Sequence, residues 1–153
     1  MSTTADTQPN DDVDLPIVVG IDGSECSLTA LRWADGQARL TSRPLRAVMT
    51  WEWPNTYGDP VVWPEDISFE AIATRVLRES AEKVLGPERA DEVELRVLEG
   101  PAALVLDDES ARAALLVVGS RGHGEFAGML IGSVSEFLAT HSHCPVVIVR
   151  GGA

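Results

Sequence analysis

The sequence predicts an open, doubly wound, Rossmann-like α/β fold, with a mostly parallel sheet of about five strands and helices on both faces. Short runs rich in Val and Ile alternate along the chain with longer segments whose apolar residues recur at helical spacing. The connections are short, and strands and helices that alternate in this way form parallel sheets with right-handed crossovers. A length of 153 residues with 44% hydrophobic residues suits one compact domain.

The first half of the chain predicts two strands and two helices. Residues 17–21, IVVGI, form a continuous apolar run typical of a strand buried on both faces. Apolar residues then recur at helical spacing to about Leu40, and Ser24 or Ser27 can cap that helix. Residues 46–50 predict the second strand. An apolar stripe over residues 65–85 predicts the second helix, which ends at Gly86-Pro87.

The second half predicts three strands and two helices. Residues 93–98 alternate apolar and charged side chains, as an edge or half-buried strand does. A helix begins at Gly100-Pro101 and leads into the acidic run of residues 107–109, which we interpret as a solvated helix face. A strand over residues 115–118, a helix ending near His141 and a final strand over residues 145–150 complete the pattern.

Charge and hydropathy restrict the class of partner. A net charge of −12 opposes binding to nucleic acid or to an anionic membrane, because both require a basic face. No apolar run approaches the roughly 18 residues of a membrane span. The first residues are polar and acidic rather than basic and then apolar, which predicts a cytoplasmic protein. We expect a disordered acidic tail over residues 1–15 and a single domain over residues 16–153.

A glycine-rich stretch follows the strand at residues 115–118. Its glycines are Gly119, Gly122, Gly124, Gly128 and Gly132. Glycine lets backbone N–H groups approach an anion closely, and the helix that follows offers unpaired N–H groups at its start. No Lys follows these glycines, so the stretch is not a P-loop, and its spacing does not fit the dinucleotide fingerprint. The pattern nevertheless predicts a phosphate site.

The glycine spacing resembles the signature of ATP-binding universal stress proteins. That signature is a glycine, two residues, a glycine, nine residues, then glycine and serine, here Gly119, Gly122 and Gly132-Ser133. The resemblance covers residues 17–150 and includes the entry to the last strand at Cys144-Pro145. It implies the strand order 3-2-1-4-5, an ATP ligand with or without Mg²⁺, a homodimer and a stress-associated regulatory role.

The implied strand order brings Asp22 and Gly119 to the ends of neighbouring strands, where open α/β sheets bind ligands. Asp22 then either borders the nucleotide or accepts turn N–H groups as an Asx cap. By resemblance, the ends of the first two strands border adenine and ribose, and the glycine motif holds the phosphates through N–H and hydroxyl donors. The implied nucleotide-binding residues are Ile21, Asp22, Gly23, Val48, Met49, Gly119, Ser120, Arg121, Gly122, Met129, Gly132, Ser133, Val134 and Ser135.

Catalysis is a weaker prediction than binding. Phosphoryl transfer requires positioned cations and an oriented nucleophile. Arg121 is the one plausible cation in the motif, and the loop residue His123 is not a convincing base. We therefore expect ATP binding with little or no turnover, no catalytic residues and no protein metal site. The alternatives are a slow ATPase or nucleotidyl-transfer enzyme that uses Asp22 and Mg²⁺, and a structural dimer that binds no nucleotide.

Residues 51–64 form the least regular part of the sequence. They contain three of the four tryptophans, the only tyrosine and three prolines. Prolines and Gly58 exclude a regular element. The segment leaves the second strand at its carboxyl end, so residues 51–63 can close over a bound base, contact an unidentified protein partner, or cover the end of the sheet.

The last strand predicts the assembly. Val146 to Val149 is fully apolar, and in the implied order it lies at the edge of the sheet. Open backbone groups and aliphatic side chains at an edge favour association, here a homodimer through Val146 to Val149 about a two-fold axis. The alternative is a monomer whose edge is covered by a helix or by the last residues.

Overall fold

The computed structural model describes residues 14–54, 57–58, 62–122 and 131–151, so residues 1–13 of the acidic tail expected over residues 1–15 lie outside the described residues. The elements, in chain order, are β1 Ile17–Gly20, α1 Glu25–Thr41, β2 Leu45–Trp51, α2 Phe69–Leu85, α3 Pro87–Glu92, β3 Glu94–Glu99, α4 Ala102–Ser110, β4 Leu115–Gly119, α5 Ser133–His141 and β5 Val146–Val149. Within the described ranges, no helix is long and apolar enough to cross a membrane.

The five strands form one parallel sheet in the order β3-β2-β1-β4-β5, which confirms the predicted fold class and strand order. Strand β1 lies at the centre, with Ile17 opposite Leu45 of β2 on one side and opposite Leu115 of β4 on the other. Val18 and Val19 in this strand are fully buried. The continuous apolar runs in the sequence thus reflect strands covered on both faces.

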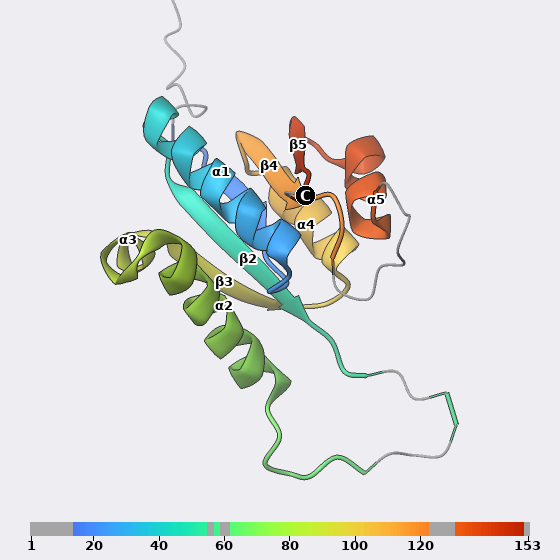
Figure 1. Cartoon of the computed structure of the whole chain (residues 1–153). Coiled ribbons are helices and arrows are strands. Elements are labelled where there is room, and N and C mark those ends of the chain that lie inside the picture. Colours follow the sequence, from blue (N-terminus) through green and yellow to red (C-terminus); the bar gives the residue numbers. More distant parts are fainter. Residues whose placement is uncertain (1–13, 55–56, 59–61, 123–130, 152–153) are drawn as a thin grey trace, which may run out of the picture.

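Helices cover both faces of the sheet, as Figure 1 shows. On one face, Val19 packs in a core with Leu31 of α1 and Leu77 of α2. On the other, Val18 packs with Leu106 of α4 and Leu138 of α5. Neighbouring residues of β1 therefore supply opposite cores, because successive side chains of a strand point to opposite faces.

Two helical boundaries differ from the prediction. Helix α2 begins at Phe69 rather than near residue 65, because Ser68 caps it by accepting the N–H of Ala71 at 3.1 Å. Gly86, at φ +83°, ends α2 as expected, but Pro87 then starts the unpredicted helix α3. Glycine fits the positive φ of the junction, and proline suits the first turn of a helix. One Gly-Pro pair therefore ends α2 and starts α3.

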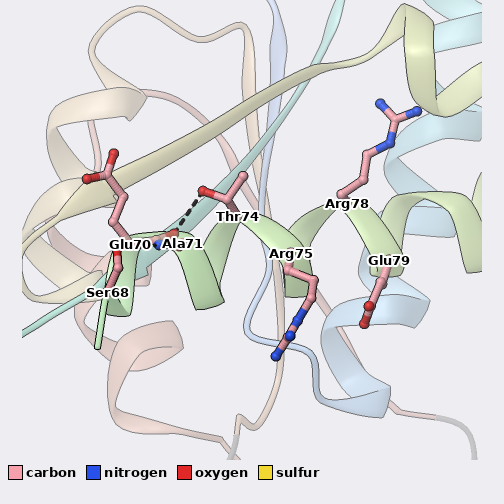
Figure 2. A pocket seen from close by; sticks show the side chains of 7 residues that line it. All are labelled: Ser68, Glu70, Ala71, Thr74, Arg75, Arg78 and Glu79. Atoms are coloured by element: carbon pink, nitrogen blue, oxygen red, sulfur yellow. Dashed lines mark hydrogen bonds between the residues drawn. The ribbon is translucent and has the colours of Figure 1, made fainter. Parts of the chain in front are cut away.

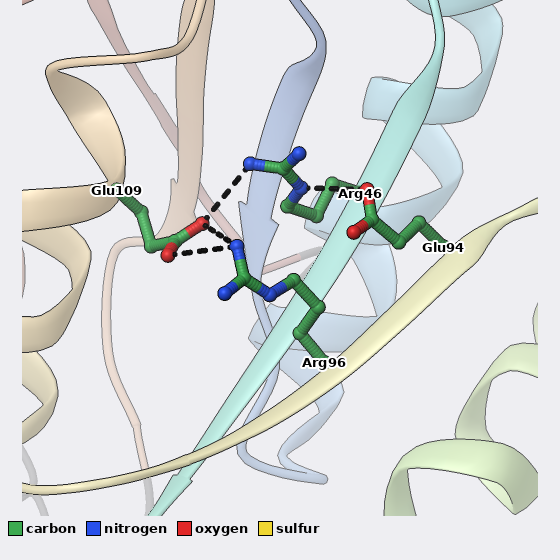
Figure 3. A network of polar contacts seen from close by, with 4 residues as sticks. All are labelled: Arg46, Glu94, Arg96 and Glu109. Carbon is green, nitrogen blue, oxygen red and sulfur yellow. Dashed lines mark hydrogen bonds and ion pairs between the residues drawn. The ribbon is translucent and has the colours of Figure 1, made fainter.

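The interpretation of residues 107–109 as a solvated face is wrong for Glu109. Its side chain is only 12% exposed and accepts hydrogen bonds from Arg46 of β2 at 3.2 Å and from Arg96 of β3 at 3.1 Å (Figure 3). Arg46 also donates to Glu94 at 2.7 Å. Burial lowers the pKa of the Arg46 guanidinium, but the carboxylates of Glu94 and Glu109 raise that pKa by more. This ion-pair network joins α4 to β2 and β3.

Candidate functional site

A cavity of about 450 Å³ opens at the carboxyl ends of the central strands, at the point where the order of the sheet reverses between β1 and β4. Its lining residues are Gly20, Ile21, Asp22, Ser27, Val48, Met49, Thr50, Ala102, Leu106, Val118, Gly119, Arg121, Gly122, Gly132, Ser133, Val134 and Ser135. Segments almost a hundred residues apart in the sequence therefore meet in one crevice.

The cavity brings together most of the residues that the sequence assigned to nucleotide binding. Those that line it are Ile21, Asp22, Val48, Met49, Gly119, Arg121, Gly122, Gly132, Ser133, Val134 and Ser135. Gly23 does not line it, because it forms the turn before α1 at φ +83°. Ser120 does not line it either and is only 4% exposed. Met129 and His123 lie outside the described residues.

Asp22 forms the Asx cap that the sequence offered as one of its two roles, and it also lines the cavity. One carboxylate oxygen, Oδ1, accepts the N–H of Ser24 at 2.9 Å, which is the Asx cap of the turn into α1. The other oxygen, Oδ2, lies where a Cβ on Gly122 would be. Asp22 thus lines the cavity and at the same time holds the β1 turn against the glycine motif, and only glycine fits at position 122 without displacing the carboxylate.

The amino end of α5 forms the polar side of the cavity. Gly132 is the N-cap, and no side chain among the described residues caps this helix. The carbonyl of Gly132 accepts the N–H of Glu136 at 3.0 Å, so the first intrahelical bond uses the amide of Glu136. The amides of residues 133–135 precede that bond and belong to the first turn, where helices leave N–H groups without intrahelical partners. A positive dipole end and such amides suit an anion.

Ser120 holds the motif in place rather than lining the cavity. Its N–H donates to the carbonyl of Val149 at 2.8 Å, and its own carbonyl accepts the N–H of Gly132 at 2.5 Å. These bonds join the end of β4 to β5 and to the start of α5. Ser120 therefore positions the amino end of α5 beside Gly119.

Ser135 departs from its expected role as a hydroxyl donor to phosphate. Its Oγ donates to the carbonyl of Gly119 at 2.6 Å, and the residue is only 2% exposed. A serine hydroxyl carries one proton, so that proton is already engaged. Ser133 is exposed, and its hydroxyl faces no such competitor among the bonds within the described residues.

Sequence reasoning missed the side of the cavity that α4 supplies. Ala102 and Leu106 line it together with Gly20 and Val118. Leu106 Cδ1 lies 2.9 Å from the place where a Cβ on Gly20 would be, so the leucine closes directly on the strand backbone. A glycine inside an apolar strand often marks such a close approach, and Gly20 was the available signal. With Val48 and Val118, Leu106 gives the cavity an apolar side suited to a flat base.

The charges around the cavity are few. Of the described lining residues, Arg121 is the one cation and Asp22 the one carboxylate. Within the described ranges, no group of three His, Cys, Asp or Glu side chains could hold a metal ion. None of the four tryptophans lines the cavity. Among the described lining residues, the backbone amides at the start of α5 and the Arg121 guanidinium are therefore the groups that can attract an anionic ligand.

The fold and the cavity define a class: an open α/β domain with a glycine-lined cavity at the switch point of its sheet. The universal stress protein family model matches residues 15–150, and the chain belongs to that family. This confirms the universal stress protein family that the glycine spacing indicated.

Curated relatives agree with this family assignment. A universal stress protein of Mycobacterium tuberculosis is 36% identical over 134 residues, which cover 88% of this chain and 47% of the relative. One of Mycolicibacterium smegmatis is 37% identical over 149 residues, which cover 95% of this chain and 49% of the relative. The chain thus spans about half the length of these curated relatives.

Solved structures share the fold over most of the chain. A universal stress protein in complex with cAMP is 28% identical, with a TM-score of 0.62, and the match covers 90% of this chain and 97% of that one. A universal stress protein from Archaeoglobus fulgidus in complex with dAMP is 23% identical, with a TM-score of 0.57, and the match covers 90% of this chain and 98% of that one.

Proposed function

We propose that this chain is an ATP-binding, nucleotide-responsive regulatory protein of the cytoplasm with little or no turnover. One observation carries the proposal: the cavity at the β1/β4 switch point combines an apolar side at Leu106 with the amino end of α5, which no side chain of the described residues caps. The first suits a base and the second suits phosphates. The cAMP complex of a relative at 28% identity supports a nucleotide as the ligand class.

The proposal assigns a part of the ligand to each side of the cavity. Adenine packs between Val48 and Leu106, and Asp22 lies at the ribose end. The phosphates lie against the N–H groups of residues 133–135, with Arg121 at the rim. Because the whole chain carries a charge of −12, Mg²⁺ bound to the phosphates would reduce the repulsion of the most anionic ligand.

Ligand released from freshly purified protein, identified by mass spectrometry, tests the ligand class directly. We expect adenine nucleotide at near one equivalent, and ATP added to emptied protein should bind in calorimetry. Release of no nucleotide together with no heat of ATP binding would favour the structural dimer that binds no ligand.

The rival function is a slow ATPase or nucleotidyl-transfer enzyme that uses Asp22 and Mg²⁺. Asp22 does line the cavity, but Oδ1 already accepts the N–H of Ser24. We expect ATP held by the protein with Mg²⁺ to remain intact over hours, because a single cation and no positioned base line the described cavity. If ADP or a nucleotidylated protein accumulates with the unmodified chain but not with Asp22→Asn, the chain is such an enzyme instead.

We also propose that two copies pair through β5. All four residues of this edge strand are half-buried, with Val147 on the α1 face of the sheet and Ile148 on the α5 face. The opposite edge strand, β3, carries Glu94, Arg96 and Glu99, and charges are a common protection of edges against pairing. A two-fold axis beside β5 would make the contact self-complementary.

Charge substitution on β5 should dissociate the dimer. We expect Val147→Lys or Ile148→Asp, whichever faces the partner, to give a monomer in sedimentation at micromolar concentration. Val97→Lys on β3 is the matched control, because Val97 is also half-buried on an edge strand and on the same face as Val147. A monomeric unmodified chain, or two β5 variants that both remain dimeric, would contradict this interface.

A further inference from the structure

Four aromatic rings form a cluster where the sheet passes into α2. Trp51 ends β2 and contacts Trp53 edge to face at 6.0 Å between ring centroids. Phe69, the first residue of α2, contacts Trp53 at 5.5 Å and Trp63 at 5.4 Å in the same geometry. We call these four rings the aromatic clasp, because they join the two ends of the segment between β2 and α2. The described parts of that segment extend away from the sheet (Figure 1).

The clasp leaves much aromatic surface in solvent. Trp53 is 55% exposed and Trp63 is 37% exposed, although both contact Phe69. Edge-to-face contacts hold the rings at steep angles to one another, 82° and 85° for the two Phe69 pairs. Rings fixed in this way keep their orientation, so a ligand can meet them with little loss of conformational entropy.

The segment that carries the clasp contains acidic but no basic residues. No Lys or Arg occurs between Arg46 and Arg75, whereas the same stretch contains Glu52, Asp59, Glu65, Asp66 and Glu70. Of the described acids, Glu52, Glu65, Asp66 and Glu70 are all exposed. They form no ion pair within the described part of the chain. Carboxylates thus lie next to the rings in the sequence, with no cation of the same segment to neutralise them.

A surface hollow of about 600 Å³ begins beside the clasp and runs along α2. Its residues are Ser68, Glu70, Ala71, Thr74, Arg75, Arg78 and Glu79, and Figure 2 shows them along one helix. Arg78 is already paired with Glu82 and Asp91. The lining of the hollow balances the carboxylates of Glu70 and Glu79 with Arg75 and Arg78, so the acidic excess belongs to the residues around the clasp and not to the hollow.

We propose that the aromatic clasp and its acidic flanks dock a basic segment of a partner protein, with arginine side chains on Trp53 and Trp63. Guanidinium groups stack on indole faces and pair with carboxylates, so one side chain satisfies both features of the surface. Anionic membranes, nucleic acids and a second copy of this acidic chain carry the wrong charge. This inference concerns a surface apart from the nucleotide cavity and does not rest on the proposed function.

Titration with a short peptide of alternating arginine and glycine tests the proposal. Calorimetry and tryptophan fluorescence measure the binding. We expect binding that weakens as salt increases, and no binding of the matching glutamate–glycine peptide. Trp53→Ala and Trp63→Ala should each weaken binding about fivefold, whereas Trp33→Ala, an exposed tryptophan on α1, should leave it unchanged. Gly132→Glu should also bind the peptide normally, which separates this surface from the nucleotide site.

Two triple variants distinguish local recognition from general attraction to an acidic protein. Glu52→Gln with Glu65→Gln and Asp66→Asn removes charge beside the clasp, and Asp14→Asn with Glu88→Gln and Asp108→Asn removes the same charge elsewhere. We expect only the first triple to weaken binding by tenfold or more. Equal weakening by both triples, normal binding by Trp53→Ala, or preferential binding to anionic vesicles or to a second copy in sedimentation would each overturn the proposal.

Discussion

Gly132→Glu is expected to abolish ATP binding while the fold stays intact. The new carboxylate would lie at the N-cap of α5, beside the amides of residues 133–135 that the phosphates are proposed to use. It would repel the phosphates and compete for those donors, at a cost of about 3 kcal/mol or more in binding free energy, which is more than a hundredfold. Gly132 has φ −78°, an ordinary value for any residue, so the backbone tolerates the change.

Calorimetry with ATP measures this effect, and circular dichroism and thermal unfolding check the fold. Gly36→Glu is the matched control, because it makes the same change on α1 where nothing lies within 4 Å of an added Cβ. Gly122→Ala should weaken binding as well, since its Cβ would displace Asp22 from its place in the cavity. Unchanged ATP affinity in Gly132→Glu would show that the phosphates do not bind at the amino end of α5.

Glu109→Ala is expected to destabilise the folded chain by about 2 kcal/mol. Removal of one partner from a buried ion pair costs about 3–5 kcal/mol, and the partial exposure of Arg46 and Arg96 lowers that figure. The remaining guanidinium groups would lie against the sheet with only Glu94 to pair with. Helix α4 would also lose an anchor at one end, while its other end lines the cavity at Ala102 and Leu106.

Urea unfolding of the variant measures the loss as a lower midpoint at an unchanged slope. Glu82→Ala is the control, because it breaks an ion pair with Arg78 whose side chains are 41% and 42% exposed. Exposed pairs contribute about 0–1 kcal/mol, so the control should unfold close to the unmodified chain. If Glu109→Ala proves no more destabilising than Glu82→Ala, the network joins α4 to the sheet without stabilising it.

The sequence predicted the strands and long helices well, because their signals are local and periodic. It missed α3 because Gly86-Pro87 was interpreted only as the end of a helix. Pro87 is itself a marker of a helix start, but the same pair also ends α2, so the signal is ambiguous. What makes α3 pack is tertiary, namely the ion pair between Arg89 and Asp35 of α1 at 2.7 Å. The burial of Glu109 was missed for a similar reason, since its arginine partners come from two other elements.

The candidate site could likewise be predicted from the sequence only in part. Residues of the glycine motif and at the ends of β1 and β2 could be assigned from the family resemblance, and the cavity brings most of them together. Leu106 and Ala102 could not, because helix residues enter a cavity through packing and leave no motif. Ser120 and Ser135 were expected to donate N–H or hydroxyl groups to the ligand, whereas the backbone of Ser120 and the hydroxyl of Ser135 form bonds within the protein.

The two edges of the sheet differ, and this difference limits the number of copies that can assemble. An aggregate or filament needs two different adhesive surfaces on each molecule, so that every added copy presents a fresh one. Here the charged strand β3 ends one side of the sheet, and the apolar strand β5 ends the other. If two copies join through β5, the resulting ten-stranded layer would end in β3 on both sides, with Glu94 and Arg96 at its margins. Association through this sheet would then stop at two, and the molecule would avoid fibre formation without a separate protective element.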